Sequence, residues 1–308
     1  FNNLFPLEGS QLGVLCVDGV GTKVLLAQLA NDFTTIGIDG VAMVANDCIR
    51  CGATPLAIAD VLDVHHSDKK LVSELMRGVK KASDEISCPI VGGETADVPE
   101  LSAGVSDNPF QFNFACFGAV EKSKLIDSRN LREGDALIAL PSSGVHSNGL
   151  SLARKVLFKK WGGAFDASDT PSALSKSGKS VLSELLTPTR LYVKPFLAAA
   201  SAVKVKSAVH VTGDAFLKFK EVQKFSEVGF EFEVEVDEIP PVFQLIHDAA
   251  AKLGKTLSWS EMFSTFNMGL GFVFAVDKSD ETAALASLKK AGAIDAFVCG
   301  RVTREKKI

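Results

Sequence analysis

Short runs of apolar residues recur along the chain, some continuous and some alternating with polar residues, as in β-strands. They predict strands at 12–17, 55–64, 88–93, 110–120, 135–140, 207–213, 230–236, 268–276 and 296–302. Between these runs, apolar residues recur three and four positions apart, the period of a helix with one buried face. They predict helices at 39–52, 67–86, 150–161, 191–203, 216–225, 240–254 and 280–292.

The mixture of strands and helices predicts an α+β fold (mixed α/β). A chain of 308 residues is long enough for two domains, and the polar turn around Gly134 is the best candidate for their boundary. We therefore expect an N-terminal domain at 1–134 and a C-terminal domain at 135–308. The pattern is lost between about 162 and 179, where we expect a surface insertion.

Several polar residues interrupt apolar elements. Asn46 and Asp47 fall inside the predicted helix 39–52, where a polar side chain must be paired or must face a cleft. Asp39 lies eight positions before Asp47, roughly on the same helical face, so both carboxylates are predicted to point to one place. Asp60 interrupts the predicted strand 55–64 in the same way. A solvated helix face is the alternative for the helical residues, and their apolar flanks favour a site.

Two polar loops follow predicted strands. In VGGETADVPE, residues 91–100, twin glycines precede Glu94, and acids on such a loop are common Mg²⁺ ligands. The alternative is an ordinary acidic turn. In LPSSGVHSNGLSL, residues 140–152, a Ser/Gly/Asn loop leads into a helix start, where backbone N–H groups bind anions. His146 is predicted to donate to a phosphate or to transfer a proton, whereas Ser147 or Asn148 is expected at least to cap the helix.

The stretch VDGVGTK, residues 17–23, resembles a phosphate loop but has the wrong glycine spacing for a P-loop. Its glycines would let Asp18 and Lys23 converge, one on a metal ion and the other on phosphate oxygens. A tight turn with a surface ion pair is the alternative. A phosphate ligand would therefore be bound by a fold other than the P-loop or dinucleotide-binding folds.

The composition of the chain indicates which binding partners and which cellular location to expect. The net charge of −4 gives no electrostatic case for nucleic acid or an anionic membrane. No apolar run is long enough to span a bilayer, so we expect a cytoplasmic protein. The six cysteines lie mostly in apolar runs, which predicts buried free thiols.

Motifs in order along the chain carry a family resemblance. They are DGVGTK, IGIDGVAMVANDCIRCGATPL, VGGETADVPE, SSGVHSNGLSLARK, TPTRLYVKP, HVTG and FNMGLGFVFAV. In this order the chain, from about Leu15 to Arg304, resembles the aminoimidazole ribonucleotide (AIR) synthetases, also called phosphoribosylformylglycinamidine cyclo-ligases. The resemblance implies a two-domain fold whose N-terminal sheets form a dimeric barrel, beside a C-terminal α/β domain. It also implies ATP-dependent closure of the imidazole ring of formylglycinamidine ribonucleotide in purine biosynthesis, with ATP and Mg²⁺ as cofactors, in a homodimer.

The resemblance implies roles for the residues in these motifs. Those expected to bind ATP or substrate are Asp18, Gly19, Gly21, Thr22, Lys23, Asn46, Gly92, Gly93, Thr95, Ser142, Ser143, His146, Ser147, Asn148, Thr212 and Gly213. Those expected to hold the metal are Asp18, Asp39, Asp47, Asp60 and Glu94. Lys23 is expected to contact phosphates, and His146 and His210 are the candidates for moving protons.

Two departures from the family pattern keep other functions open. HVTGDAF, residues 210–216, has Asp214 and Ala215 where the family has glycines, and only Phe1 to Glu8 precede the first predicted strand. The alternatives are another ATP-dependent enzyme of the superfamily, such as a formylglycinamidine ribonucleotide synthetase, and a non-catalytic nucleotide-binding module.

Overall fold

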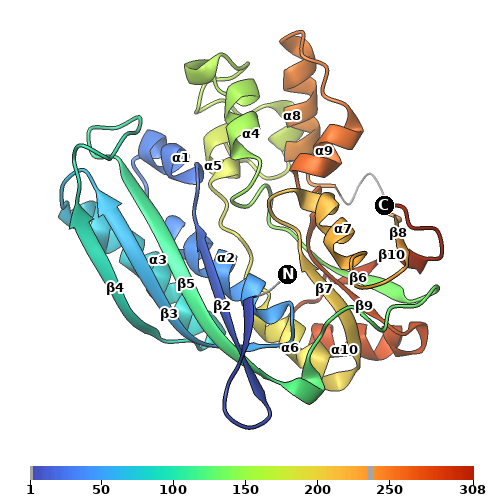
Figure 1. The fold of residues 1–308 in the computed structure, drawn as a ribbon. Coiled ribbons are helices and arrows are strands. Elements are labelled where there is room, and N and C mark those ends of the chain that lie inside the picture. The colour runs from blue at the N-terminus through green and yellow to red at the C-terminus, as the bar shows by residue number, and fades with distance from the viewer. Residues whose placement is uncertain (1–2, 235–238) are drawn as a thin grey trace.

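The computed structural model describes residues 3–234 and 239–308. In Figure 1 two sheets lie side by side, each with its own helices. The elements of the first half are β1 Asn3–Pro6, β2 Gln11–Gly19, α1 Lys23–Ala30, α2 Ile36–Ile49, β3 Thr54–Val64, α3 Lys69–Ile86, β4 Ile90–Asp97 and β5 Phe110–Glu121. Those of the second half are β6 Ala136–Pro141, α4 Leu150–Leu157, α5 Val181–Leu185, α6 Val193–Ala202, β7 Val205–His210, α7 Phe219–Val222, β8 Gly229–Phe232, α8 Pro241–Lys252, α9 Trp259–Thr265, β9 Leu270–Val276, α10 Glu281–Lys290 and β10 Phe297–Thr303.

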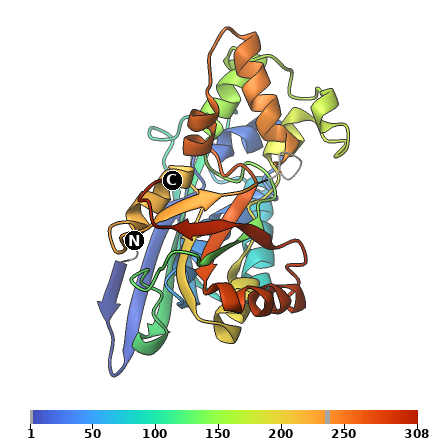
Figure 2. The ribbon, with the colours of Figure 1, turned by 90° about the vertical axis from the view of Figure 1, so that its right-hand side faces the viewer.

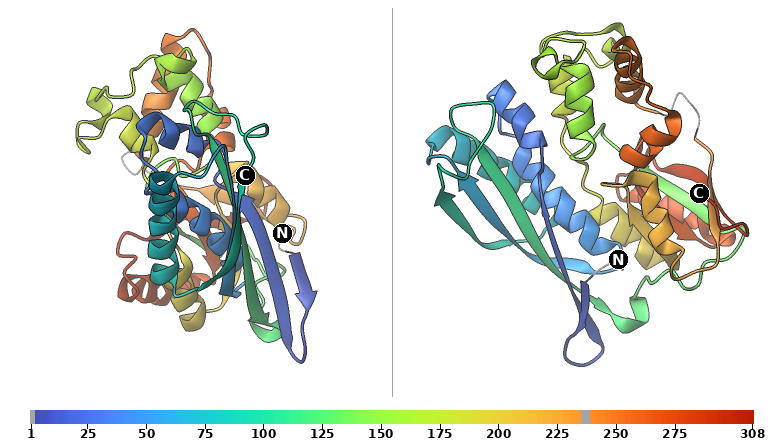
Figure 3. Two further views of the ribbon diagram at one scale, coloured as in Figure 1. Left: turned by 90° about the vertical axis from the view of Figure 1, so that its left-hand side faces the viewer. Right: turned by 45° about the horizontal axis from the view of Figure 1, so that its top comes forward.

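The first sheet has the order β1-β2-β5-β3-β4, antiparallel except for the parallel pair β3 and β4. Seen nearly on edge in Figure 3 (left), its helices cover one face and leave the other open. On β5 every second side chain points to the covered face, where Phe110, Phe112 and Phe114 are buried. The strict alternation predicted for this strand is confirmed, and it explains why one face of the sheet is a core and the other is not.

Helix α2 is buried on nearly every side because it lies between the first sheet and α3 and also contacts α6 (Figure 3, right). Glycine makes this possible at two contacts. A Cβ at Gly40 would lie 1.9 Å from a ring carbon of Phe114, and one at Gly37 would lie 2.3 Å from the carbonyl oxygen of Leu75 on α3. These close approaches hold α2 tightly against the first sheet and against α3.

The second sheet has the order β7-β9-β6-β10-β8, and each pair of neighbouring strands in it is antiparallel. Helices α6 and α10 lie against one face, as the view in Figure 2 shows. Side chains of β6 alternate between two cores. Ile138 joins the core of the first half, whereas Leu137 joins a separate core under α4 and α8. The first of these two cores contains residues from both halves of the chain.

Most elements predicted from the pattern are present. Helix α3 begins after Asp68, whose side chain caps the helix by accepting a hydrogen bond from Leu71 N at 2.8 Å. Helix α2 begins at Ile36, three residues before the predicted start. The expectation that no strand precedes residue 12 is wrong, because β1 pairs with β2 as a hairpin. The predicted strand 230–236 ends at Phe232, and its last two residues lie outside the described residues.

Two predictions from composition can also be compared with the structure. The six cysteines are free, five of them buried and Cys16 partly buried, which confirms the predicted thiols. Across residues 3–234 and 239–308, no helix has the length and apolar character that a membrane crossing needs.

Candidate active site

Three loops meet where the two halves face each other. The turn after β2 approaches the loop before α4, since a Cβ at Gly21 would lie 4.0 Å from Ser147 O and the hydroxyls of Thr22 and Ser151 are 3.4 Å apart. The loop before α4 in turn approaches the loop after β7, because a Cβ at Gly213 would lie 3.4 Å from the side-chain oxygen of Asn148. Three of the segments predicted to bind ATP and substrate, 18–23, 142–148 and 212–213, therefore lie close to one another.

The best-defined contact across the two halves joins α2 to β7. His210 Nδ1 lies 2.9 Å from Asp47 Oδ1, so the imidazole donates this hydrogen bond to the carboxylate. Burial alone would raise the pKa of Asp47, but Arg50 and His210 together hold it well below its ordinary value. Burial lowers the pKa of His210, and Asp47 opposes that shift. Asp47 is therefore an anion, and its side chain is 23% exposed while that of His210 is fully buried.

Asn46 holds the neighbouring segment. Its side-chain nitrogen donates to Arg190 O at 2.9 Å, and its side-chain oxygen accepts from Tyr192 N at 2.9 Å. Both partners belong to the segment before α6. The residue predicted to bind a ligand therefore makes hydrogen bonds that fix one half of the molecule to the other, which satisfies a buried amide.

Lys23 and Asp39 form a buried pair. Lys23 Nζ lies 2.9 Å from Asp39 Oδ1 and 2.7 Å from Thr187 O, and both side chains are fully buried. The same carboxylate oxygen accepts from the backbone N of Thr189 at 2.7 Å. Two expectations therefore fail in this structure. Lys23 presents its ammonium to Asp39 rather than to a phosphate. Asp39 contacts Ser147 and Thr189, whereas Asp47 contacts His210, so the two carboxylates do not share a contact.

His146 is buried, with 1% of its surface exposed. Its Nε2 accepts from Ser143 N at 3.1 Å, which assigns the proton to Nδ1. Burial lowers the pKa of His146 well below its usual range, and the charges of His210 and Lys23 act in the same direction. The ring is therefore packed inside the loop before α4 in its neutral form.

The five predicted metal ligands are not gathered into one group. Strand register places Asp18 and Asp60 on either side of Phe114, on the covered face of the first sheet. Register also places Glu94 beside Val61, whose side chain is 43% exposed on the open face. Among the described residues, no group of three or more His, Cys, Asp or Glu side chains is arranged to hold a metal ion. A site of two carboxylates completed by phosphate oxygens and water is the arrangement that remains.

The other predicted residues lie in the same loops or at the edge of the first sheet. Gly92, Gly93 and Thr95 lie on the edge strand β4. Gly93 packs against Asp60, because a Cβ at Gly93 would lie 2.9 Å from the Asp60 carboxylate. Ser143 Oγ donates to Pro188 O at 2.6 Å, and Ser147 Oγ donates to Asp39 at 3.2 Å. These serines hold the loop in place. Gly19 ends β2 and donates its N–H to the Asp18 side chain at 2.7 Å.

Lys218 and Arg50 were missed by the sequence reasoning. Lys218, at the end of a turn after β7, donates to His210 O at 3.3 Å and to the hydroxyl of Thr212. Arg50, at the end of α2, lies 3.5 Å from the Asp47 carboxylate. Both sit in stretches that read as ordinary helix surface, so the sequence carried no signal for them. We call Asp18, Asp47, Arg50, His210, Asp214 and Lys218 the interdomain charge cluster.

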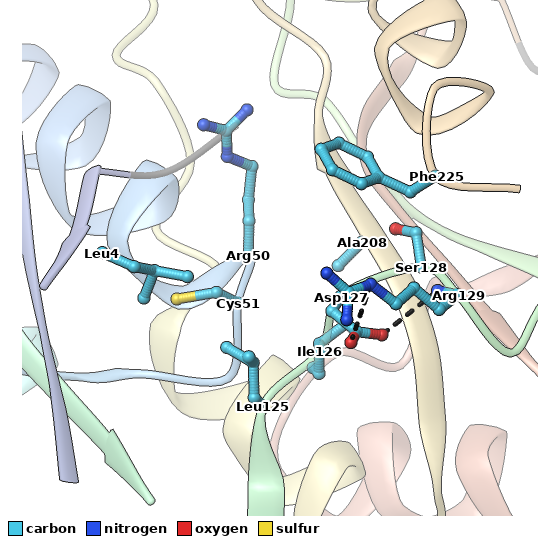
Figure 4. Close-up of a pocket in the computed structure, with 10 residues that line it drawn as sticks. All are labelled: Leu4, Arg50, Cys51, Leu125, Ile126, Asp127, Ser128, Arg129, Ala208 and Phe225. Atoms are coloured by element: carbon cyan, nitrogen blue, oxygen red, sulfur yellow. Dashed lines mark hydrogen bonds and ion pairs between the residues drawn. The ribbon is translucent and has the colours of Figure 1, made fainter. Parts of the chain in front are cut away.

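A cavity of about 220 Å³ adjoins this cluster at Arg50 (Figure 4). Its walls come from both halves of the chain, including Leu4 of β1, Ile126 of the linker after β5 and Ala208 of β7, with the ring of Phe225 opposite Arg50. Arg50 therefore has one side toward the cavity and the other toward Asp47.

The sequence matches two protein-family models that together span nearly the whole chain. Residues 3–120 match the AIR synthase related protein, N-terminal domain, and residues 132–308 match its C-terminal domain. The chain belongs to the AIR synthase-related family. The family resemblance inferred from the motifs is thereby confirmed.

Relatives and solved structures agree with this membership. A phosphoribosylformylglycinamidine cyclo-ligase of Methanococcus maripaludis is 39% identical over 94% of this chain and 77% of its own length. One of Thermococcus gammatolerans is 38% identical over 96% of this chain and 80% of its own length. The structure of a protein titled AaThiL, complexed with AMPPCP and TMP, is 16% identical with a TM-score of 0.63, over all of this chain and 86% of that one. At that identity the likeness shows the fold, and the predicted two-part mixed α/β architecture is confirmed.

Proposed function

We propose that the protein is an ATP-dependent phosphoribosylformylglycinamidine cyclo-ligase whose reaction takes place at the interdomain charge cluster. The similarity to cyclo-ligases over more than nine-tenths of the chain carries this proposal. The same similarity disfavours the synthetase-like enzyme and the non-catalytic module, since both relatives are phosphoribosylformylglycinamidine cyclo-ligases. ATP and formylglycinamidine ribonucleotide are the ligands.

The reaction needs two steps. The formamide oxygen attacks the γ-phosphorus of ATP, the bond from that phosphorus to the β,γ-bridging oxygen breaks, ADP leaves, and the formamide N–H proton is lost. The amidine nitrogen then attacks the activated carbon, the carbon–oxygen bond breaks, and phosphate leaves together with the nitrogen's proton. Such phosphoryl transfer depends on positioning and charge stabilisation rather than on a protein nucleophile. A ring closure also gains rate from holding the substrate folded.

The residues support these needs as follows. Burial raises the pKa of Asp18, and the charge of Asp47 acts in the same direction. These two carboxylates would hold Mg²⁺, which when bound would neutralise charge on the triphosphate. His210 positions Asp47 through the Nδ1 hydrogen bond. We assign neither His146 nor His210 the proton-moving role expected from the sequence, because both rings are buried.

The direct test is phosphate release from ATP with formylglycinamidine ribonucleotide, together with detection of the aminoimidazole product. Asp47→Asn is expected to lower turnover by about 100-fold or more, since it removes one of two anionic ligands. The matched control is Asp84→Asn, an exposed carboxylate paired with Lys80 on α3. Phosphate release without the aminoimidazole product would point to another enzyme of the superfamily. ATP binding without phosphate release would point to a non-catalytic module.

We also propose a homodimer formed through the open face of the first sheet. Apolar side chains on this sheet are exposed: Leu15 by 42%, Leu56 by 47%, Val17 by 69% and Val61 by 43%. A contiguous apolar sheet face of this kind is typical of an interface. Val17→Glu should convert a dimer to a monomer by light scattering. Ile294→Glu, at a 74% exposed position in the second half, should not. A wild-type monomer at micromolar concentration would contradict the proposal.

The free thiols favour a cytoplasmic location. Disulfides persist in oxidising compartments, whereas the six cysteines of this chain are free in the structure. Fractionation of cells that express the protein would check this, and recovery outside the cytoplasm would contradict it.

A further inference from the structure

Lys218 has an unusual position for a lysine. It ends the turn Ala215–Lys218 directly after β7, and its ammonium group donates to His210 O at 3.3 Å and to the Thr212 hydroxyl. These acceptors fix the end of a long, flexible side chain at the carboxyl end of a strand. An ammonium group has three N–H donors. Within the described residues only these two acceptors are found for it, so one donor remains for a ligand.

The charged groups that act on the pKa of Lys218 come from three parts of the chain. Asp47 and Arg50 lie on α2, Asp18 lies at the end of β2, and Asp214 lies in the loop after β7. Burial lowers the pKa of Lys218, and the three carboxylates oppose that shift. The ammonium group contacts the backbone of His210, whose ring binds the Asp47 carboxylate proposed to hold the magnesium–nucleotide complex. It therefore lies close to that site, in a partly buried place where a charge contact with phosphate is strong.

The other cations near the cluster are already engaged. Lys23 is fully buried on Asp39, and Arg50 lies against the Asp47 carboxylate and backbone. Asp214, just before the turn, and Ala215, its first residue, have φ values of 62° and 43°, in the left-handed region that glycine favours. This strained backbone geometry turns the chain back, so that Lys218 at the end of the turn lies over the end of β7.

We propose that Lys218 is a phosphate-binding residue of this site and supplies the cationic contact that the sequence had suggested for Lys23. Its ammonium group contacts non-bridging oxygens of the triphosphate and stabilises the charge that moves onto them during phosphoryl transfer. This inference rests on the proposed function for the identity of the nucleotide. The triphosphate contact itself rests on the geometry of the cluster.

The first experiment compares Lys218→Met with Lys220→Met, which removes an exposed lysine two residues further along the same segment. Lys218→Met should lower kcat/KM for ATP by about 100-fold, the scale of one lost charge-stabilising donor. Lys220→Met should stay within twofold of the wild type. Lys218→Arg, which keeps the charge, should recover part of the loss, and a merely structural lysine would not give that pattern. Equal activity in the two methionine variants would overturn the proposal.

The second experiment measures binding of inorganic tripolyphosphate with Mg²⁺ by calorimetry and needs no turnover. Lys218→Met should weaken the Kd by about tenfold or more, the size of one charge-assisted contact. If that variant does not fold, Lys218→Gln takes its place. An unchanged Kd would overturn the proposal. If the wild type makes no aminoimidazole product, the proposed function fails, and this binding measurement alone decides the role of Lys218.

Discussion

The buried pair of Lys23 and Asp39 separates a structural lysine from a phosphate-binding one. Lys23→Met would leave the Asp39 carboxylate buried without a cation, although Thr189 and Ser147 still donate to it. Removing one partner of a buried ion pair costs about 3–5 kcal/mol of unfolding free energy. For a chain of this length that unfolds cooperatively, the loss corresponds to a fall in Tm of about 5–8 °C.

The assay is thermal unfolding of Lys23→Met beside Lys80→Met, which removes a lysine that is 75% exposed and paired on α3. The control should change the unfolding free energy by less than about 0.5 kcal/mol, because exposed pairs contribute little. The double variant Lys23→Met/Asp39→Asn should recover most of the loss, since the amide keeps an acceptor for Thr189 without a charge. The reasoning is refuted if Lys23→Met melts with the control while its turnover collapses, because Lys23 would then act on the substrate.

Three further perturbations test the remaining packing and charge arguments. Because His146 is buried with a lowered pKa, the unfolded chain binds its proton first below pH 6.5, so stability is full above that value and falls as the pH drops. The loss is at most about 1.4 kcal/mol per pH unit for this group, and denaturant titrations at pH 7.5 and 5.5 should show a smaller pH dependence in His146→Gln. Asp214→Gly should raise the unfolding free energy by about 0.5–1 kcal/mol, since glycine adopts a φ of 62° without strain. A urea midpoint equal to or below that of the wild type would show that no strain is stored at Asp214. Gly40→Ala should cost about 1–3 kcal/mol because its methyl group would overlap the ring of Phe114, and a wild-type unfolding midpoint would show that α2 can move away.

Local patterns in the sequence were enough for much of the fold. The strict alternation from Phe110 to Val120 follows from one face packing on helices, and the cap at Asp68 follows from the short side chain's reach to a backbone N–H. The family was also readable, because its loop motifs combine glycines, acids and a Ser/Asn loop in a specific order. These are properties of neighbouring residues, and neighbouring residues are what a sequence displays.

The tertiary structure alone decided which of the candidate residues face one another. Whether Lys23 meets Asp39 or a phosphate depends on the segment at Thr187, far along the chain, and the register of β4 on β3 decides that Glu94 lies on the open face. A one-residue change of register would reverse that face. Lys218 acquired its place only when the turn after β7 folded back over Thr212. Such contacts join distant segments through packing and strand pairing, and no local pattern of polar and apolar residues specifies them.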